Sequence, residues 1–187
     1  MSTKPSNDAE RILIVDDEQA VCRFLSGSLA KEGYLCKTAE RASSVLRMMV
    51  EFNPALVIAD VRMPGLSGLQ LLDLVRQYFP ATSVVIMTGY GTMEDAAGVI
   101  KRGASDFVLK PLGLPKIKTV VRKVLDDRRA WLDRQDDALR RMAEATPVEA
   151  DPAVSPADLQ VVVDAWPRLS NAVKAGILAV VKAANVE

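Results

Sequence analysis

Histidine is absent from the 187 residues of this sequence. A Ser-His-Asp triad, a Cys-His nucleophile pair and an HExxH zinc site all require an imidazole, so the sequence excludes each of them. The chain also cannot carry a phosphohistidine. Any chemistry at this chain must therefore use carboxylates, hydroxyls, amines or thiols.

Cysteine is scarce, and long apolar runs are missing. The two cysteines, Cys22 and Cys36, form no CxxC motif and no ligand cluster, so we expect reduced thiols in a cytoplasmic protein. No apolar run approaches the roughly 18 residues that span a membrane, and we expect no membrane association. Residues 1–9 are polar, without the apolar stretch of a signal peptide, and predict a short disordered leader.

A surplus of basic charge is also missing, because 24 Lys and Arg residues are balanced by 24 Asp and Glu residues. Proteins that bind nucleic acid usually carry a basic surplus on one face. The overall charge therefore gives no support to that function, although it does not exclude a local patch. The length, set against roughly 150 residues per domain, predicts one domain with an appendage.

Apolar runs typical of buried strands alternate with helical patterns between residues 11 and 127. Five such runs predict strands, at 12–15, 34–38, 56–59, 83–87 and 106–109. Helices are predicted between them, among them 42–52 and 93–101. Strands that alternate with helices pair in parallel, so we expect an α/β fold with a doubly wound five-stranded parallel sheet.

The first two predicted helices carry apolar stripes that we expect to face the sheet. In the first helix the stripe is Val21, Phe24, Leu25 and Leu29. In the second helix the apolar residues are Val45, Leu46, Met49 and Val50.

Polar side chains stand where the predicted strands end. Asp16 and Asp17 follow the first strand, Asp60 the third, Thr88 the fourth and Lys110 the fifth. Ligands of doubly wound sheets bind beyond the carboxyl ends of the strands, so these side chains should converge at one edge. Carboxylates favour a hard cation such as Mg²⁺, and an aspartate can accept a phosphoryl group. Repulsion should raise the pKa of at least one acid when no metal is bound.

Four motifs occur in order at these strand ends. They are Ile-Val-Asp-Asp-Glu (14–18), Ile-Ala-Asp-Val-Arg-Met-Pro-Gly-Leu-Ser-Gly (58–68), Ile-Met-Thr-Gly-Tyr-Gly (86–91) and Gly-Ala-Ser-Asp-Phe-Val-Leu-Lys-Pro (103–111). Together they closely resemble the receiver domain of two-component response regulators, over about residues 10–127. The last two motifs are similar to those of receivers from nitrogen-regulation and nitrogen-fixation regulators. The resemblance implies a flavodoxin-like receiver fold.

The resemblance implies that Asp60 is the phosphorylated residue. It implies Mg²⁺ held by Asp16, Asp17, Asp60 and the backbone carbonyl of Arg62. The phosphoryl group would come from a sensor histidine kinase, a phosphotransfer protein or a small phosphodonor. The chain would then be no enzyme toward other substrates, since it would catalyse only its own phosphorylation and dephosphorylation.

The resemblance also implies a switch. Lys110 would pair with the phosphoryl group, and the peptide bond between Lys110 and Pro111 would be cis. Thr88 would turn its hydroxyl inward onto the phosphoryl group, and Phe107 would move from exposed to buried. The surface of the fourth and fifth helices would change as a result.

Simpler and rival interpretations stand beside this one. Each aspartate alone could be an ordinary turn residue, Lys110 a solvated lysine and Phe107 an ordinary core residue. A haloacid-dehalogenase type of magnesium-dependent phosphohydrolase also uses an aspartate at a strand end, with a second acid two residues later. Glu18 stands two residues after Asp16, although the remaining spacing fits receivers better.

The character of the sequence changes after residue 111. Residues 114–144 predict one long helix with an imperfect heptad seam. Leucines recur every seven residues, at Leu125, Leu132 and Leu139. The alternate positions are partly polar and comprise Val121, Arg128, Gln135 and Met142. We assign residues 10–127 to the receiver and residues 128–145 to a helical extension.

Residues 146–155 predict a linker, and residues 156–187 predict a small helical hairpin. The apolar faces of the hairpin comprise Leu159, Val162, Val163 and Trp166, then Val173, Ile177, Val180, Val181 and Ala184. About 30 residues are too few to fold alone, so the hairpin must pack on the receiver, on a second copy or on a partner.

The output remains open between several alternatives. A homodimer could form through the face of the fourth and fifth helices or through the long helix. A DNA-binding transcriptional regulator is a further alternative, but the hairpin has only three basic groups for phosphate contacts, Arg168, Lys174 and Lys182. We therefore favour a hairpin that docks on protein, as in an adaptor of a phosphorelay.

Overall fold

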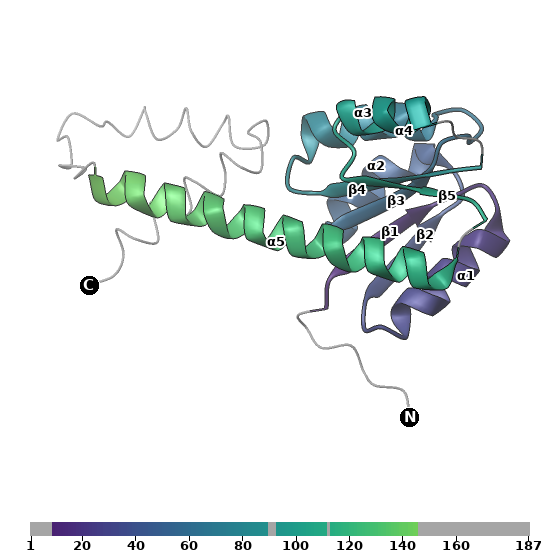
Figure 1. Cartoon of the computed structure of the whole chain (residues 1–187), viewed down its shortest axis with the longest axis horizontal. Coiled ribbons are helices and arrows are strands. Elements are labelled where there is room, and N and C mark those ends of the chain that lie inside the picture. The colour runs from purple at the N-terminus through teal and green to yellow at the C-terminus, as the bar shows by residue number, and fades with distance from the viewer. Residues whose placement is uncertain (1–8, 90–92, 112, 146–187) are drawn as a thin grey trace. The chain divides into compact units, whose positions relative to one another are not determined.

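The computed structural model describes residues 9–89, 93–111 and 113–145. Within these residues five strands alternate with five helices (Figure 1). In chain order they are β1 Arg11–Val15, α1 Gln19–Ala30, β2 Leu35–Ala39, α2 Ala42–Phe52, β3 Leu56–Asp60, α3 Gly68–Tyr78, β4 Ser83–Thr88, α4 Met93–Lys101, β5 Asp106–Leu109 and α5 Leu114–Ala145. The elements predicted from the sequence are confirmed, with boundaries that differ by about one residue.

The strands form one parallel sheet in the order β2-β1-β3-β4-β5. The order reverses direction at β1, because the chain first adds β2 on one side and then returns to add β3 on the other. This confirms the predicted doubly wound sheet. Parallel strands all end at the same edge, so residues that follow β1, β3, β4 and β5 are brought together there.

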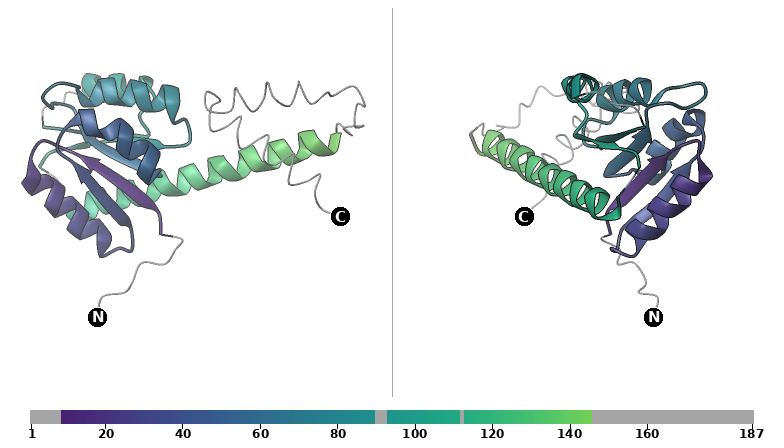
Figure 2. Two further views of the ribbon diagram at one scale, coloured as in Figure 1. Left: turned by 180° about the vertical axis from the view of Figure 1, so that it is seen from behind. Right: turned by 45° about the vertical axis from the view of Figure 1, so that its right-hand side comes forward.

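Helices cover both faces of the sheet, as the views from behind and from the side show (Figure 2). On one face α1 and α5 pack over side chains such as Ile14 and Ile58. On the other face α2, α3 and α4 pack over side chains such as Leu13 and Val57. Alternate residues of the central strands β1, β3 and β4 thus enter different cores, which is why these strands are almost entirely apolar.

The predicted stripes of the first two helices are correct only in part. Val45 and Met49 are fully or almost fully buried, whereas Leu46 is 38% and Val50 is 72% exposed. Phe24 of α1 is 44% exposed. The reason is geometric, since residues i and i+4 share the face that meets the sheet, while the next residue along is turned by about 100°.

The long helix α5 was predicted to end at residue 144 and ends at Ala145. Its first half is anchored by four buried side chains, Ile117, Val121, Val124 and Leu125. The chain divides into two units, Met1–Arg129 and Ala130–Glu187, and the border lies within α5. The predicted leader, apart from Ala9, and the predicted linker and hairpin lie outside the described residues. No helix of the described part is long and apolar enough to span a membrane.

Candidate functional site

Three charged side chains lie at the carboxyl edge of the sheet, each at the end of a different strand. Asp16 follows β1, Asp60 is the last residue of β3, and Lys110 follows β5. Asp16 is fully buried and Asp60 is only 6% exposed. Buried carboxylates are rare unless they are paired or coordinated, so their position at this edge marks a site rather than a surface.

Lys110 joins the two aspartates. Its Nζ lies 2.8 Å from Asp16 Oδ2 and 2.9 Å from Asp60 Oδ1. Glu18 is a more distant third partner, at 3.5 Å. Two buried carboxylates thus face a single ammonium, and one negative charge is left uncompensated between them. Such a site attracts a further cation.

Backbone donors hold the remaining carboxylate oxygens. The Glu18 N–H donates to Asp16 Oδ1 at 2.9 Å, and the Arg62 N–H donates to Asp60 Oδ2 at 2.7 Å. Each aspartate therefore has both oxygens engaged, one by Lys110 and one by an N–H two residues further along the chain. This fixes the orientation of both carboxylates before any ligand binds.

Burial is the main influence on the pKa values of Asp16 and Lys110. Burial raises the pKa of Asp16 above its ordinary value, and the hydrogen bonds and charge of Lys110 offset this only in part. Repulsion from Asp60 is the smallest of the contributions. The expected rise in the pKa of one acid is therefore found, but its main cause is desolvation rather than the repulsion we had invoked. Burial alone would lower the pKa of Lys110, yet its contacts with Asp16 and Asp60 raise it, so Lys110 is charged at neutral pH.

The other predicted residues occupy places around this cluster. Thr88 ends β4 and is half-buried, and its carbonyl accepts a hydrogen bond of 2.7 Å from the Lys110 N–H. The Lys110–Pro111 peptide bond is cis. Phe107 is half-buried on β5 and packs against the core beneath α2, α3 and α4. Asp17 is exposed and is not among the residues that Lys110 joins.

Two residues that matter to the site were not assigned a site role from the sequence. Glu18 supplies the N–H that orients Asp16. Gly68 begins α3 so close to β3 that an added Cβ would lie only 2.1 Å from the Asp60 carbonyl oxygen. Ser67 caps this helix by accepting from the Gln70 N–H, which fixes where α3 starts. Glycine immediately after a capping serine was the available signal.

The donor set fits Mg²⁺ by its chemistry. Mg²⁺ prefers oxygen ligands, binds through one or two carboxylates and keeps several waters. Asp16 and Asp60 supply two carboxylates with an uncompensated charge. Among the described residues no three acidic or cysteine side chains are gathered as a ready-made cage.

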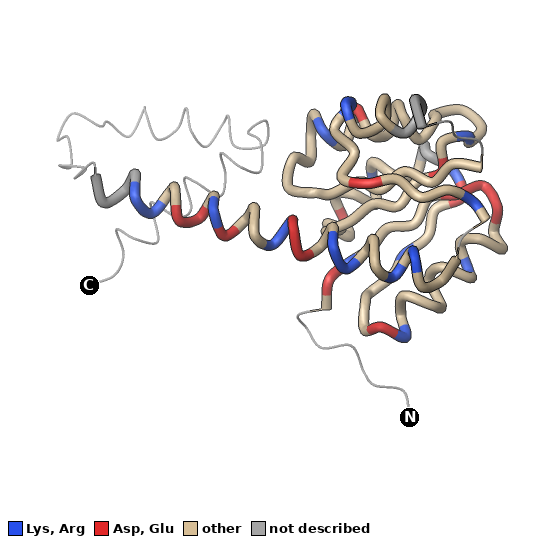
Figure 3. The backbone as a smooth tube through the Cα atoms, viewed as in Figure 1, with Lys and Arg blue, Asp and Glu red and all other residues tan. Residues whose placement is uncertain are grey.

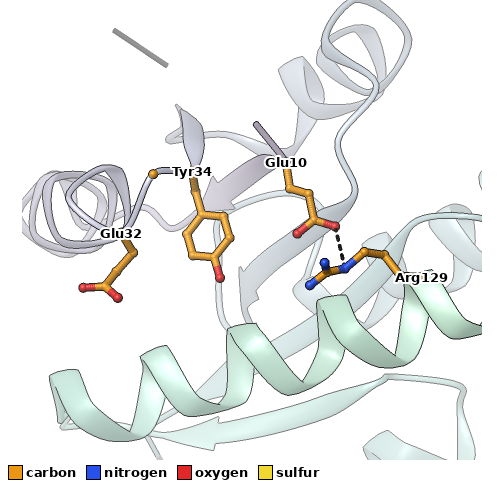
Figure 4. A pocket seen from close by; sticks show the side chains of 5 residues that line it. Glu10, Glu32, Tyr34 and Arg129 are labelled. Carbon is orange, nitrogen blue, oxygen red and sulfur yellow. Dashed lines mark ion pairs between the residues drawn. The ribbon is translucent and has the colours of Figure 1, made fainter. Parts of the chain in front are cut away.

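A second concave site lies away from these aspartates. It has a volume of about 450 Å³ and is lined by Glu10, Glu32, Gly33, Tyr34 and Arg129 (Figure 4). Glu10 and Tyr34 precede β1 and β2, so this pocket is at the amino ends of the strands. Arg129 Nε lies 3.6 Å from Glu10 Oε1 across it.

Comparisons with known proteins agree with this geometry. Residues 12–122 match the family model of the response regulator receiver domain. The nitrogen assimilation regulatory protein NtrX of Azorhizobium caulinodans is 35% identical over 138 residues, which is 73% of this chain and 30% of that protein. The regulatory protein AtoC of Escherichia coli is 36% identical over 62% of this chain and 25% of its own length.

Solved structures show the same relationship. The receiver domain of NtrX from Brucella abortus is 37% identical with a TM-score of 0.59, and the match covers 62% of this chain and 98% of that one. A longer NtrX structure from the same organism, in complex with ADP, has 32% identity and a TM-score of 0.65, covering 74% of this chain and 34% of that one. This chain spans less than a third of the curated relatives named above. It belongs to the family of response regulator receiver domains and is thereby part of a two-component signalling system.

Proposed function

We propose that this protein receives a phosphoryl group on Asp60 and passes the signal on by changing a protein-interaction surface. The observation that carries the proposal is the state of Asp60. Its carboxylate is 6% exposed, lies at the end of a central strand, and is held by Lys110 at 2.9 Å and by the Arg62 N–H at 2.7 Å. Receiver domains autocatalyse their own phosphorylation.

The chemistry follows from these contacts. A carboxylate oxygen of Asp60 forms a bond to phosphorus while the bond from phosphorus to the donor breaks, and the donor leaves with its electron pair. Receiver domains are phosphorylated by histidine kinases, so a phosphohistidine is the expected donor. Lys110, already placed against Asp60, offsets the charge of the incoming phosphoryl oxygens. Preorganised charge of this kind lowers the barrier without further rearrangement.

Mg²⁺ would be held by Asp16, Asp17, Asp60 and the backbone carbonyl of Arg62. When bound, it would neutralise negative charge on the phosphoryl oxygens. Asp16 would supply a buried carboxylate to this set, and Asp17 an exposed one.

Thr88 and Phe107 would form the switch. Thr88 stands at the end of the strand beside Asp60, since Asp60 pairs with Met87 in the sheet. Phe107 pairs with Ile86 on the neighbouring strand and is only partly buried, so an inward turn would remove further apolar surface from water. The Lys110 N–H bond to the Thr88 carbonyl links the two strand ends that would move.

The test is phosphorylation by a small phosphodonor, acetyl phosphate, with Mg²⁺ present, followed by intact mass. The native chain should gain one phosphoryl group, and Asp60→Asn should gain none. Asp73→Asn is the matched control, because Asp73 is an exposed aspartate on α3 that is paired with Arg102. Labelling of Asp60→Asn at the native level would refute the assignment, and chelation of Mg²⁺ should abolish labelling of the native chain.

For the output we propose a protein partner rather than DNA. The first charged residues of α5 are four cations, Lys116, Lys118, Arg122 and Lys123. Three of them are paired with acids of the receiver, Lys118 and Arg122 with Glu32 and Lys123 with Asp106. From Asp126 onward, acidic and basic residues alternate in short groups (Figure 3). Backbone phosphates of DNA are bound by clustered cations, and those at the start of α5 are largely paired with acids. Light scattering with Mg²⁺, with and without beryllofluoride as a mimic of the phosphoryl group, separates the alternatives. A mass that doubles only with beryllofluoride indicates a dimer that forms on phosphorylation. A mass that stays that of a monomer indicates docking on another protein.

A further inference from the structure

The long helix α5 carries one apolar stripe along its length. In its first half the stripe includes Val124 and Leu125, which are buried in the receiver core. Seven residues later the same stripe presents Trp131 and Leu132, and seven residues after that Ala138 and Leu139. Trp131 is 37% and Leu139 is 36% exposed. The pattern that anchors α5 to the receiver therefore continues past Arg129 as a stripe of four residues, Trp131, Leu132, Ala138 and Leu139, of which Leu132 is half-buried and the other three are exposed.

A second copy of the chain is a poor occupant for this stripe. A stable two-stranded coiled coil needs an apolar seam of about three to four heptads. Here the seam cannot extend toward the receiver, because Arg128 donates from Nε to the Ala81 carbonyl at 2.7 Å and Val124 and Leu125 are already covered. Gln135 interrupts what remains, which is little more than two heptads before α5 ends at Ala145.

Residues 156–187 are a better match, since they carry apolar faces that need a partner. They predict two short helices with faces that include Leu159, Val162 and Ile177. Alone they are too short to fold. The α5 segment from 130 to 145 is about 24 Å long at 1.5 Å per residue, close to the length of the second predicted helix and longer than the first, so it can cover both. The ten residues 146–155 reach at most about 35 Å, enough to return the chain to either end of the stripe.

The place of residues 156–187 in the sequence supports the same pairing, because the predicted linker 146–155 begins directly where α5 ends. We propose that residues 156–187 fold back on the stripe of α5 and form a small three-helix unit with it. The second half of α5 would then be the third helix of that unit. This inference does not depend on phosphorylation of Asp60.

The first test is hydrogen exchange of the full chain, at a concentration where light scattering gives a monomer. Amides in 156–187 should exchange at least about tenfold more slowly than in an unstructured peptide. Leu132→Gln with Leu139→Gln should remove that protection. The matched control is Asp133→Gln with Arg140→Gln, which has the same seven-residue spacing beside the stripe and leaves the net charge at zero. Protection should survive the control.

The reciprocal test measures the solvent exposure of Trp131 in the stripe. Trp131 and Trp166 are the two tryptophans of the chain, so Trp166→Phe leaves Trp131 as the only indole. In that background Val162→Gln with Ile177→Gln should shift the Trp131 emission to longer wavelength and increase its quenching by acrylamide. Asp164→Gln with Lys182→Gln should leave both unchanged.

Three results would overturn the proposal. The first is free exchange of residues 156–187 in the native monomer. The second is protection that persists when the stripe carries glutamine. The third is shielding of Trp131 that disappears on dilution together with a dimer, which would assign the stripe to a second copy. Loss of protection in Leu132→Gln with Leu139→Gln alone, in a monomer that still accepts a phosphoryl group, would establish the fold-back contact.

Discussion

Two lysine–carboxylate pairs in this molecule have the same length and opposite electrostatics. Lys110 and Asp16 at the carboxyl edge of the sheet are 2.8 Å apart, and so are Lys118 of α5 and Glu32 of the loop after α1. Yet the pKa of Asp16 is raised, chiefly by burial, while the pKa of Glu32 is lowered, chiefly by its hydrogen bond with Lys118.

The difference lies in the solvent. The Asp16 side chain is fully buried and that of Lys110 is 18% exposed, whereas the side chains of Lys118 and Glu32 are 35% and 31% exposed. Water stabilises both charges of the Lys118–Glu32 pair, so ionisation of Glu32 costs little and the contact with Lys118 favours it further. At the carboxyl edge of the sheet, the contact with Lys110 offsets only part of the free-energy cost of removing the Asp16 carboxylate from water. A short distance therefore does not tell whether a pair stabilises the fold; its burial does.

Removal of the two lysines should show the largest contrast. Lys110→Met leaves Asp16 and Asp60 buried and facing each other without a counter-ion, and we expect a loss of about 3 kcal/mol in the free energy of unfolding at pH 7. Lys118→Met, the matched substitution, should change it little because both partners stay hydrated. Urea unfolding in the presence of EDTA measures both. Equal losses would mean that burial does not distinguish the pairs.

A glycine comparison tests the close packing of the same edge. Gly68→Ala would place a Cβ against the backbone carbonyl of Asp60, which cannot give way as a flexible side chain can, and we expect a loss of about 2 kcal/mol. Gly27→Ala in α1 meets nothing within 4 Å and should instead gain about 1 kcal/mol through helix propensity. Thermal unfolding of the two variants against the native chain gives the sign of each change, and a stabilised Gly68→Ala would contradict the close approach.

The fold and the positions of the site residues could be predicted because both follow from local patterns. Apolar runs ended by Asp16, Asp60 and Lys110 specify parallel strands, and parallel strands bring their carboxyl ends together. The burial of Phe24 and Val50 was predicted wrongly because the spacing of apolar residues gives a stripe but not the width of surface that covers it.

The hydrogen bonds and ion pairs between the site residues could not be predicted from the sequence. That Lys110 joins both aspartates depends on its side chain reaching Asp16 although β3 and β4 lie between β5 and β1, and no sequence pattern gives a side-chain distance. The Glu18 N–H was missed as a donor because backbone groups carry no sequence signal. The cause of the raised pKa of Asp16 was misjudged for the same reason, since the sequence shows neighbouring charges but not the absence of water.

The raised pKa of Asp16 gives a pH-dependent prediction. Above its ordinary pKa of 3.8 the unfolded chain ionises Asp16 more readily than the folded chain, so ionisation destabilises the fold as pH rises through that range. Asp16→Asn should therefore stabilise the protein at pH 7, with Lys110 still paired to Asp60. The gain should shrink to nothing below pH 3.8. Urea midpoints between pH 3 and 7, in EDTA, measure it, and a gain that persists in acid would assign the effect to packing instead.

The smallest change in stability is expected at the Lys118–Glu32 pair, with a sign opposite to that at Asp16. Glu32 has a lowered pKa, so its contribution to stability is present above the ordinary value of 4.5 and is lost as pH falls through the folded value. Glu32→Gln should therefore destabilise slightly at pH 7 and be neutral in acid, and because the pair is exposed, salt should weaken the effect at neutral pH. The same urea series, repeated in high salt, makes the measurement. If Glu32→Gln and Asp16→Asn shifted stability in the same direction at pH 7, burial would not be what separates the two pairs. Opposite shifts, with only that of Glu32→Gln reduced by salt, would show that two contacts of equal length differ because one of them lies in water.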